Sequence, residues 1–183
     1  MRALACLLLL MACSPNIEQQ AHPQPPVQPA PSADLASQDR DFLERAAEGS
    51  NAEVSMGALV DRHGLRGEVI AFGKLMVTDH TAINQQLTAI AKAKHISLPT
   101  SLGEHQQNFD KIVDLYRDDF DREFARAMLG DHQEAVRLFR DEASGGVDPD
   151  LKAFAAATLP KIEAHLQHAE ELPFAVPQSP LPA

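Results

Sequence analysis

Histidine recurs in this sequence at a spacing that could bring several imidazoles together inside a folded domain. The stretch FGKLMVTDH ends at His80 and is repeated in outline as FARAMLGDH, which ends at His132, fifty-two positions later. Phe, Met and His follow one another in each stretch at intervals of four residues, so in a helix they share one face. His165 and the carboxylate Glu53 also fall on stripes of apolar residues spaced three and four apart.

These residue types suggest a metal site. Imidazole and carboxylate groups bind zinc, copper, iron and nickel, so Glu53, His80, His132 and His165 are candidate ligands for a first-row transition metal ion. Burying a histidine without a partner costs free energy, and three at similar depth suggest one shared partner. A buried layer of mutually hydrogen-bonded side chains is the alternative, and the repeat could also be the trace of a duplicated helical hairpin.

The aspartates next to two of these histidines point elsewhere. Asp79 and Asp131 precede His80 and His132 directly, and neighbouring helical residues are turned about 100° apart. We therefore treat Asp79 and Asp131 as secondary polar positions, and we count Asp121 with them.

Patterns of known catalytic sites are absent from the sequence. A carboxylate-bridged di-iron centre needs Glu-x-x-His on two helices, but Val77 and Leu129 stand where those glutamates would be. There is also no P-loop, no GxSxG elbow and no HExxH zinc helix. We therefore predict no catalytic residue and favour a binding or structural role over an enzymatic one.

The other histidines near the predicted helices lack a comparable pattern. His168 follows His165 by three residues but turns toward the polar face, where we expect it to be exposed. His63, His95 and His105 fall at the expected ends of helices or in a connection, and we do not assign them to the site.

Four amphipathic helices are needed to carry the candidate ligands. Apolar residues recur at helical steps over residues 37–62, 69–90, 120–139 and 149–169. The last helix is expected to begin with Asp148 as its N-cap and Pro149 at its first position. Pro160 predicts a kink or a restart within it. The sequence has no sustained alternation of β-branched residues, so it predicts no β-strand.

The connection between the second and third helices sets the expected topology. It spans roughly residues 97–118 and contains a short amphipathic segment around Phe109 and Ile112. Two helical hairpins joined by one long crossover are typical of ferritin-like bundles. We therefore predict an all-α fold, a ferritin-like four-helix bundle whose crossover contains a short helix.

The residues outside the predicted bundle indicate export. Residues 1–12 place one positive charge before a short apolar run, as a signal peptide does. The run ends in Leu-Met-Ala-Cys, which is typical of bacterial lipoproteins in which the cysteine, here Cys13, is lipidated. A plain secretory signal or an internal membrane anchor are the alternatives. Residues 13–36 would form a Pro-rich disordered tether, 37–172 the bundle domain, and 173–183 a disordered tail.

Charge and cysteine content exclude other classes of function. The formal charge of −10 and the lack of a basic run argue against nucleic acid as a partner. Cys6 and Cys13 both lie in the N-terminal segment, so the predicted domain has no thiol for a disulfide, a metal or a nucleophile.

Several stretches together resemble a known family. FLERAAEGSNAEVSMG, FGKLMVTDH, DFDREFARAMLGDHQEAVRLF and DPDLKAFAAATLPKIEAHLQHA are similar to the bacterial domain-of-unknown-function family 4142, over about residues 39–172. The resemblance implies an exported protein with a ferritin-like helical bundle. The chain departs from the family's usual residues at positions 116–119 and at Phe124. The resemblance carries over the family's recurring polar positions, which are Glu53, Asp79, His80, Asp121, His132 and His165.

Two functions of different classes follow from the sequence. The first is an envelope-tethered helical bundle with a binding or structural role in the bacterial periplasm, attached to the membrane through Cys13. Because Ser14 rather than Asp follows that cysteine, we expect the outer membrane. The second is a metal-binding or metal-dependent redox protein that uses the His and Glu cluster.

Overall fold

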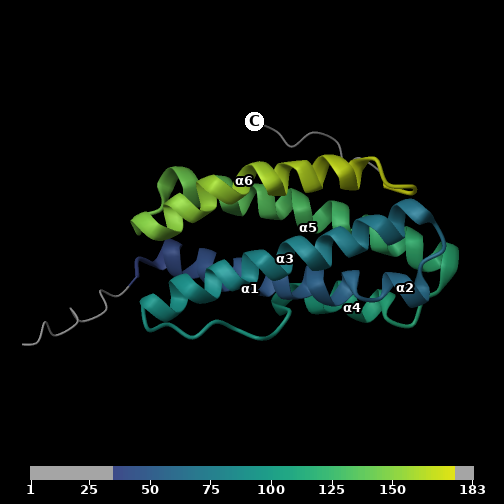
Figure 1. Cartoon of the computed structure of the whole chain (residues 1–183), viewed down its shortest axis with the longest axis horizontal. Helices are drawn as coiled ribbons and strands as arrows, with labels where there is room; N and C mark the ends of the chain where they lie inside the picture. The colour runs from purple at the N-terminus through teal and green to yellow at the C-terminus, as the bar shows by residue number, and fades with distance from the viewer. Residues whose placement is uncertain (1–34, 176–183) are drawn as a thin grey trace, which may run out of the picture. The chain divides into compact units, whose positions relative to one another are not determined.

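The computed structural model describes residues 35–175, and these residues are helical without β-strands (Figure 1). The predicted signal peptide, Cys13 and nearly all of the predicted tether, as well as the end of the predicted tail, lie outside the described residues. No helix within the described part combines the length and the apolar character needed to cross a membrane.

Two hairpins of long helices form the bundle. The first hairpin pairs α1 with α3, and the second pairs α5 with α6 (Figure 1). A long crossover that contains a 3₁₀ turn, η1, and a short helix, α4, connects the two hairpins. The all-α fold with its four-helix bundle and crossover helix is therefore confirmed. The bounds are α1 (Ser37–Gly57), α3 (Gly67–Ala93), η1 (Gly103–His105), α4 (Gln106–Ile112), α5 (Arg117–Gly145) and α6 (Pro149–Glu170).

The first helix is shorter than predicted. It ends at Gly57, and a turn leads into the short helix α2 (Val60–His63), so the helix predicted over residues 37–62 is wrong near its end. The break turns Val60 inward, where it is 1% exposed and packs on Gly73 of α3. A Cβ at Gly73 would lie 2.3 Å from a Val60 methyl, so this packing needs glycine. Helical periodicity carries no information about such a contact between helices.

The last helix begins as predicted. The Asp148 side chain accepts hydrogen bonds from the backbone N–H groups of Asp150 and Leu151, both at 3.1 Å, and Pro149 occupies the first turn. The helix then runs without interruption to Glu170. Pro160 therefore causes no restart of the helix.

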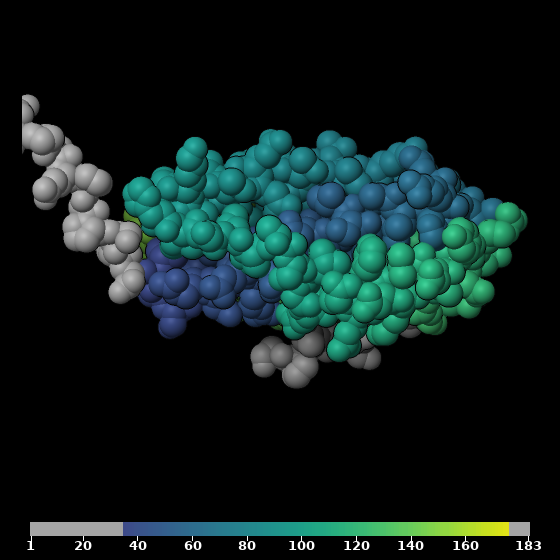
Figure 2. All heavy atoms as spheres, turned by 90° about the horizontal axis from the view of Figure 1, so that it is seen from below, coloured from purple at the N-terminus to yellow at the C-terminus, as the bar shows by residue number. Residues whose placement is uncertain are grey.

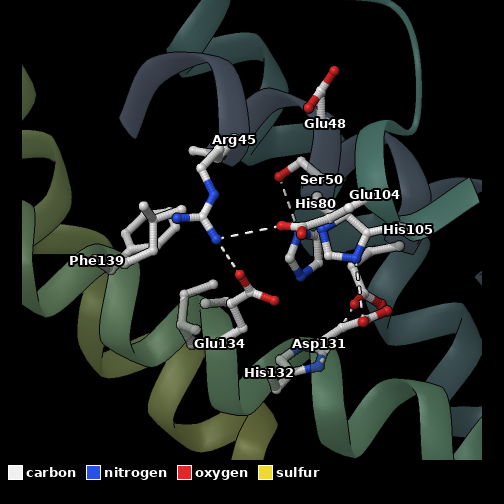
Figure 3. Close-up of a pocket in the computed structure, with 16 residues that line it drawn as sticks. Arg45, Glu48, Ser50, His80, Glu104, His105, Asp131, His132, Glu134 and Phe139 are labelled. Atoms are coloured by element: carbon white, nitrogen blue, oxygen red, sulfur yellow. Dashed lines mark hydrogen bonds and ion pairs between the residues drawn. The ribbon is translucent and has the colours of Figure 1, made fainter. Parts of the chain in front are cut away.

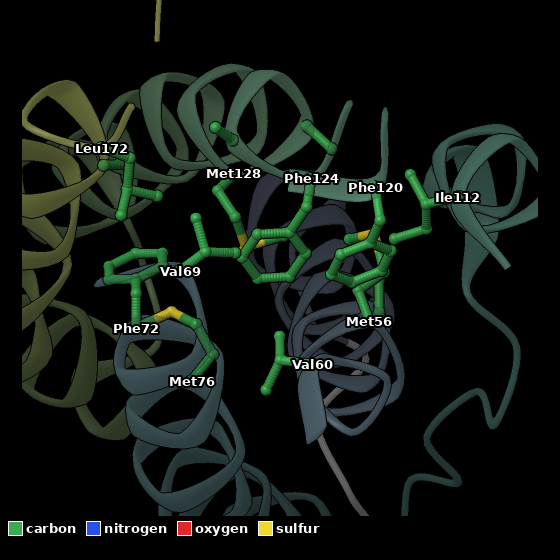
Figure 4. Close-up of a cluster of buried hydrophobic side chains, with 14 residues drawn as sticks. Met56, Val60, Val69, Phe72, Met76, Ile112, Phe120, Phe124, Met128 and Leu172 are labelled. Carbon is green, nitrogen blue, oxygen red and sulfur yellow. The ribbon is translucent and has the colours of Figure 1, made fainter. Parts of the chain in front are cut away.

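Two apolar clusters fill the bundle, and a polar layer separates them. One cluster contains Met76 (Figure 4), and the other contains Ile83. His80 lies between these two residues on α3, so it is placed where the clusters meet. A polar side chain at that depth destabilises the fold unless it has a partner. The same order recurs on α5 in Met128, His132 and Val136.

The crossover lies against α1 on the surface of the bundle (Figure 2). The Asn51 amide donates to the carbonyl oxygens of Pro99 and Ser101, each at 3.2 Å, and the Ser101 hydroxyl donates to Glu48 at 2.7 Å. Gly103 has a φ of 53° and passes so close to Glu48 that a Cβ would collide with its carboxylate. These contacts place η1 beside the polar layer.

Candidate metal centre

Three histidines from three helices meet in the polar layer. His80 on α3, His132 on α5 and His165 on α6 are each at most 4% exposed. One ring nitrogen from each lies within 4.8 Å of the corresponding nitrogen of the other two. The centroids of the three rings are 5.4 to 5.8 Å apart. The sequence prediction that these side chains share one layer is therefore correct.

The outward ring nitrogens of two histidines are held by hydrogen bonds. Nδ1 of His132 donates to the Met128 carbonyl oxygen at 2.8 Å, one helical turn earlier. Nε2 of His165 donates to the Asp79 carboxylate, also at 2.8 Å. Because a carbonyl and a carboxylate can only accept, each neutral ring has its lone pair on the opposite nitrogen. These bonds also fix the orientation of both rings.

The opposite nitrogens of the three rings, which we call the inward nitrogens, have no hydrogen-bond partner among the described residues. They are Nε2 of His80, Nε2 of His132 and Nδ1 of His165, and all three are buried. Nδ1 of His80 lies 3.1 Å from the Ser50 hydroxyl, so this third ring is also positioned from its outward side. Buried polar atoms in folded proteins are nearly always paired, so three unpartnered nitrogens in one place require an explanation.

Burial keeps all three rings neutral. It lowers the pKa of His80 well below its ordinary value, and the neighbouring His132 and His165 lower it further. Burial also lowers the pKa of His132 to about 3, although its bond to the Met128 carbonyl opposes the shift. The pKa of His165 is lowered by burial against the opposing effect of Asp79. A neutral imidazole is the form that coordinates a metal ion.

Glu53 lies beside this group but is not part of it. Its Oε1 is 3.7 Å from Nδ1 of His132, the nitrogen that bonds the Met128 carbonyl oxygen. Its Oε2 is buried and has no partner within the described residues. Burial and the nearby charge of Asp131 raise the pKa of this carboxyl well above its ordinary value. The structure thus brings three of the four predicted ligands together and places the fourth at their edge.

The secondary aspartates have three different roles. Asp79 reaches across to α6, where it binds His165 and accepts from Lys161 Nζ at 2.7 Å. Its partial burial would raise its pKa, but these two hydrogen bonds lower it overall. Asp121 accepts from the backbone N–H groups of Leu65 and Arg66, and so it fixes the start of α3 instead of joining the site.

Asp131 binds His105, a histidine that helical periodicity does not assign to the site. Its Oδ1 lies 3.2 Å from Nδ1 of His105 and accepts from the Asn108 amide at 3.0 Å. The hydrogen bond to Asp131 raises the pKa of His105. His105 lies in η1 of the crossover, where no periodicity indicates depth. Only the anchoring of the crossover on α1 brings it to the site.

Two other histidines make structural contacts, and of these only His168 differs from expectation, which placed it on the surface. His63 is buried, and its Nδ1 donates to the Leu115 carbonyl oxygen at 2.7 Å, so it ties α2 to the end of the crossover. His168 is half-buried, because its ring packs edge-on against Phe72 with centroids 4.9 Å apart. Neither contact belongs to the polar layer.

The topology does not fit the duplicated-hairpin interpretation of the repeated motif. Its two copies lie on α3, the second arm of the first hairpin, and on α5, the first arm of the second hairpin. Duplicating a hairpin would align first arms with first arms. The shared feature of the two copies is that each places its histidine in the same layer, at His80 and His132.

The donor set fits a metal ion. Each ring is oriented by a hydrogen-bonding contact on its other nitrogen, from Ser50, Met128 or Asp79. Three neutral imidazole nitrogens held in this way supply half or more of the ligands of a first-row metal ion. Three protein nitrogens leave coordination positions open for water or for another ligand.

Comparisons with known proteins agree with the fold. A solved structure described as CopM in the Cu(II)-bound form is similar with a TM-score of 0.61, at 16% identity, over 73% of this chain and 93% of that chain. No curated protein matches significantly. The match to the family described as Domain of unknown function (DUF4142) covers residues 24–172, so the chain belongs to this family.

Proposed function

We propose that this protein binds one first-row transition metal ion in the centre of its bundle, with His80, His132 and His165 as ligands. Two observations carry the proposal: the three histidines bring ring nitrogens within 4.8 Å of one another, and each ring has one buried nitrogen without a partner among the described residues. Imidazole suits copper, zinc and nickel, and Cu²⁺ forms the strongest complexes among the divalent ions of this series.

The alternative, a self-satisfied polar layer, is harder to reconcile with this geometry. In such a layer the inward atoms would be donors paired with acceptors, but His132 and His165 both direct a lone pair inward. A buried water molecule could satisfy all three rings only if the Ser50 hydroxyl donates to Nδ1 of His80 and so leaves the proton on Nε2 of that ring. In the other tautomer Nε2 of His80 also carries a lone pair, and a cation then interacts favourably with all three rings at once.

The surrounding carboxylates would support a positive ion. Asp79 accepts from His165 and so increases the electron density that the ring can offer. Glu53, with an unpartnered buried oxygen at the edge of the cluster, would become favourable as an anion once a cation is present. CopM was solved with Cu(II), and this makes Cu²⁺ the first ion to test here.

Metal loading tests the proposal directly. We expect the purified mature protein to bind one Cu²⁺ per chain in a calorimetric titration, with Ni²⁺ and Zn²⁺ weaker and Mn²⁺ weakest. Elemental analysis after gel filtration should give the same stoichiometry. A chain that retains none of these ions after gel filtration would contradict the proposal.

We also propose that the bundle is held at the bacterial envelope through a lipid on Cys13. The support is the Leu-Met-Ala-Cys sequence at the end of a short apolar run, followed by a Pro-rich stretch. Mass spectrometry of the mature N-terminus should find an acylated Cys13, and fractionation should place the protein in the outer membrane. An unmodified N-terminus downstream of Cys13 would show that the anchor is absent.

A further inference from the structure

A small pocket leads from the surface to His80 and His132, two of the three clustered histidines. It has a volume of about 40 Å³ and lies between α1, the crossover and α5 (Figure 3). Glu104 at its rim is exposed, whereas His80 and His132 at its floor are buried. A space of this size holds an ion with one or two water molecules, but no organic substrate.

Acidic side chains dominate this pocket. Five carboxyl groups and one guanidinium, that of Arg45, line it, and four of the five lie outside the buried position of Glu53, whose pKa is raised. Two carboxylates, Glu53 and Asp131, are at least nine-tenths buried, and each has an oxygen without a partner among the described residues. A narrow passage with negative walls attracts cations and repels anions. The free oxygens can replace water ligands while an ion moves inward.

We infer that this pocket is the access path for the metal cation and that Arg45 closes it. The inference rests on the proposed metal site. The Arg45 guanidinium lies over the pocket, where it pairs with Glu134 on α5 and with Glu104 on the crossover, the latter at 3.3 Å (Figure 3). It thus bridges two walls of the path, and its positive charge lies where an incoming cation must pass.

The bridge can open because its members are partly exposed. The side chains of Arg45 and Glu134 are 37% and 34% exposed, and that of Glu104 is 61% exposed. Ion pairs of this kind restrict opening by no more than about five-fold. Arg45 therefore controls the rates at which an ion enters and leaves, while the histidines control the affinity.

Two substitutions of opposite charge test the path with Cu²⁺ as the probe. Arg45→Met and Glu134→Gln both break the bridge, but one removes a positive charge and the other a negative charge. We expect both variants to release Cu²⁺ to excess EDTA about two- to five-fold faster than the wild type in stopped-flow absorbance. Charge steering alone would change the two rates in opposite directions, and this outcome would overturn the inference.

Arg40→Gln is the matched control, because Arg40 is an exposed arginine on the same helix. It should leave the release rate unchanged. Unchanged release in both bridge variants, with Cu²⁺ still bound, would overturn the access path and leave the metal site standing. Absence of Cu²⁺ binding in the wild type would instead overturn the proposed function.

Discussion

His80→Ala is expected to abolish the stabilisation that Cu²⁺ gives to the folded protein. An ion bound only by the native state adds about 4 kcal/mol to the free energy of unfolding when its free concentration is a thousand times the dissociation constant. Removing one of three imidazole ligands leaves a site too weak to bind at that concentration. His132→Ala and His165→Ala should have the same effect, because each ring supplies one inward nitrogen. Thermal melts with and without Cu²⁺, compared within each variant, measure the increment.

Two further variants make this result specific. His95→Asn removes an exposed histidine whose φ of 59° asparagine tolerates, and it should keep the full increment. Asp79→Asn keeps all three ligands but weakens the acceptor behind His165, so it should lower the affinity about ten- to a hundred-fold. If the His80→Ala protein gains as much stability from Cu²⁺ as the wild type, the site is not at the three histidines.

The contribution of His132 to the stability of the metal-free protein is expected to fall as the pH drops below about 6.5. An unfolded histidine has a pKa near 6.5, whereas burial lowers the pKa of His132 to about 3 in the folded chain. Between these values the unfolded state binds more protons, so the free energy of unfolding falls with the pH by ~1.4 kcal/mol per unit for each such group. His132 alone should therefore cost ~2 kcal/mol at pH 5.

Other buried groups act with the opposite sign, so the comparison needs a matched variant. Burial and the neighbouring Asp39 raise the pKa of Glu142 to about 7, and its contribution is present at low pH and lost as the pH rises toward 7. Urea unfolding of wild type and His132→Asn at pH 5, 6 and 7, without metal, cancels the Glu142 effect. The free energy of unfolding of the variant should change less with pH than that of the wild type. The difference in slope should correspond to about one bound proton. Parallel pH dependences would show that His132 is not buried in its neutral form.

The sequence by itself determined the helices and the faces that they bury. Apolar residues at three- and four-residue steps predicted the four long helices. The start of the last helix is set locally, by the capping side chain of Asp148 and the proline ring of Pro149. The same periodicity placed His80, His132 and His165 on inward faces at similar depth, and it did so correctly. Such features depend on neighbours within one or two helical turns, so the linear pattern contains them.

Only the tertiary structure decided which atoms meet. The packing of Val60 on Gly73 ends the first helix early, and Asn51 anchors the crossover so that His105 reaches Asp131. Both contacts join segments distant in sequence, where periodicity gives no depth or rotation. The choice of the inward nitrogen on each ring likewise depends on the partner behind it, and a rotation of one helix by a fraction of a turn would change that partner. Periodicity also could not fix the position of Glu53. The sequence pattern placed Glu53 among the ligands, whereas the packing of the helices places it beside them.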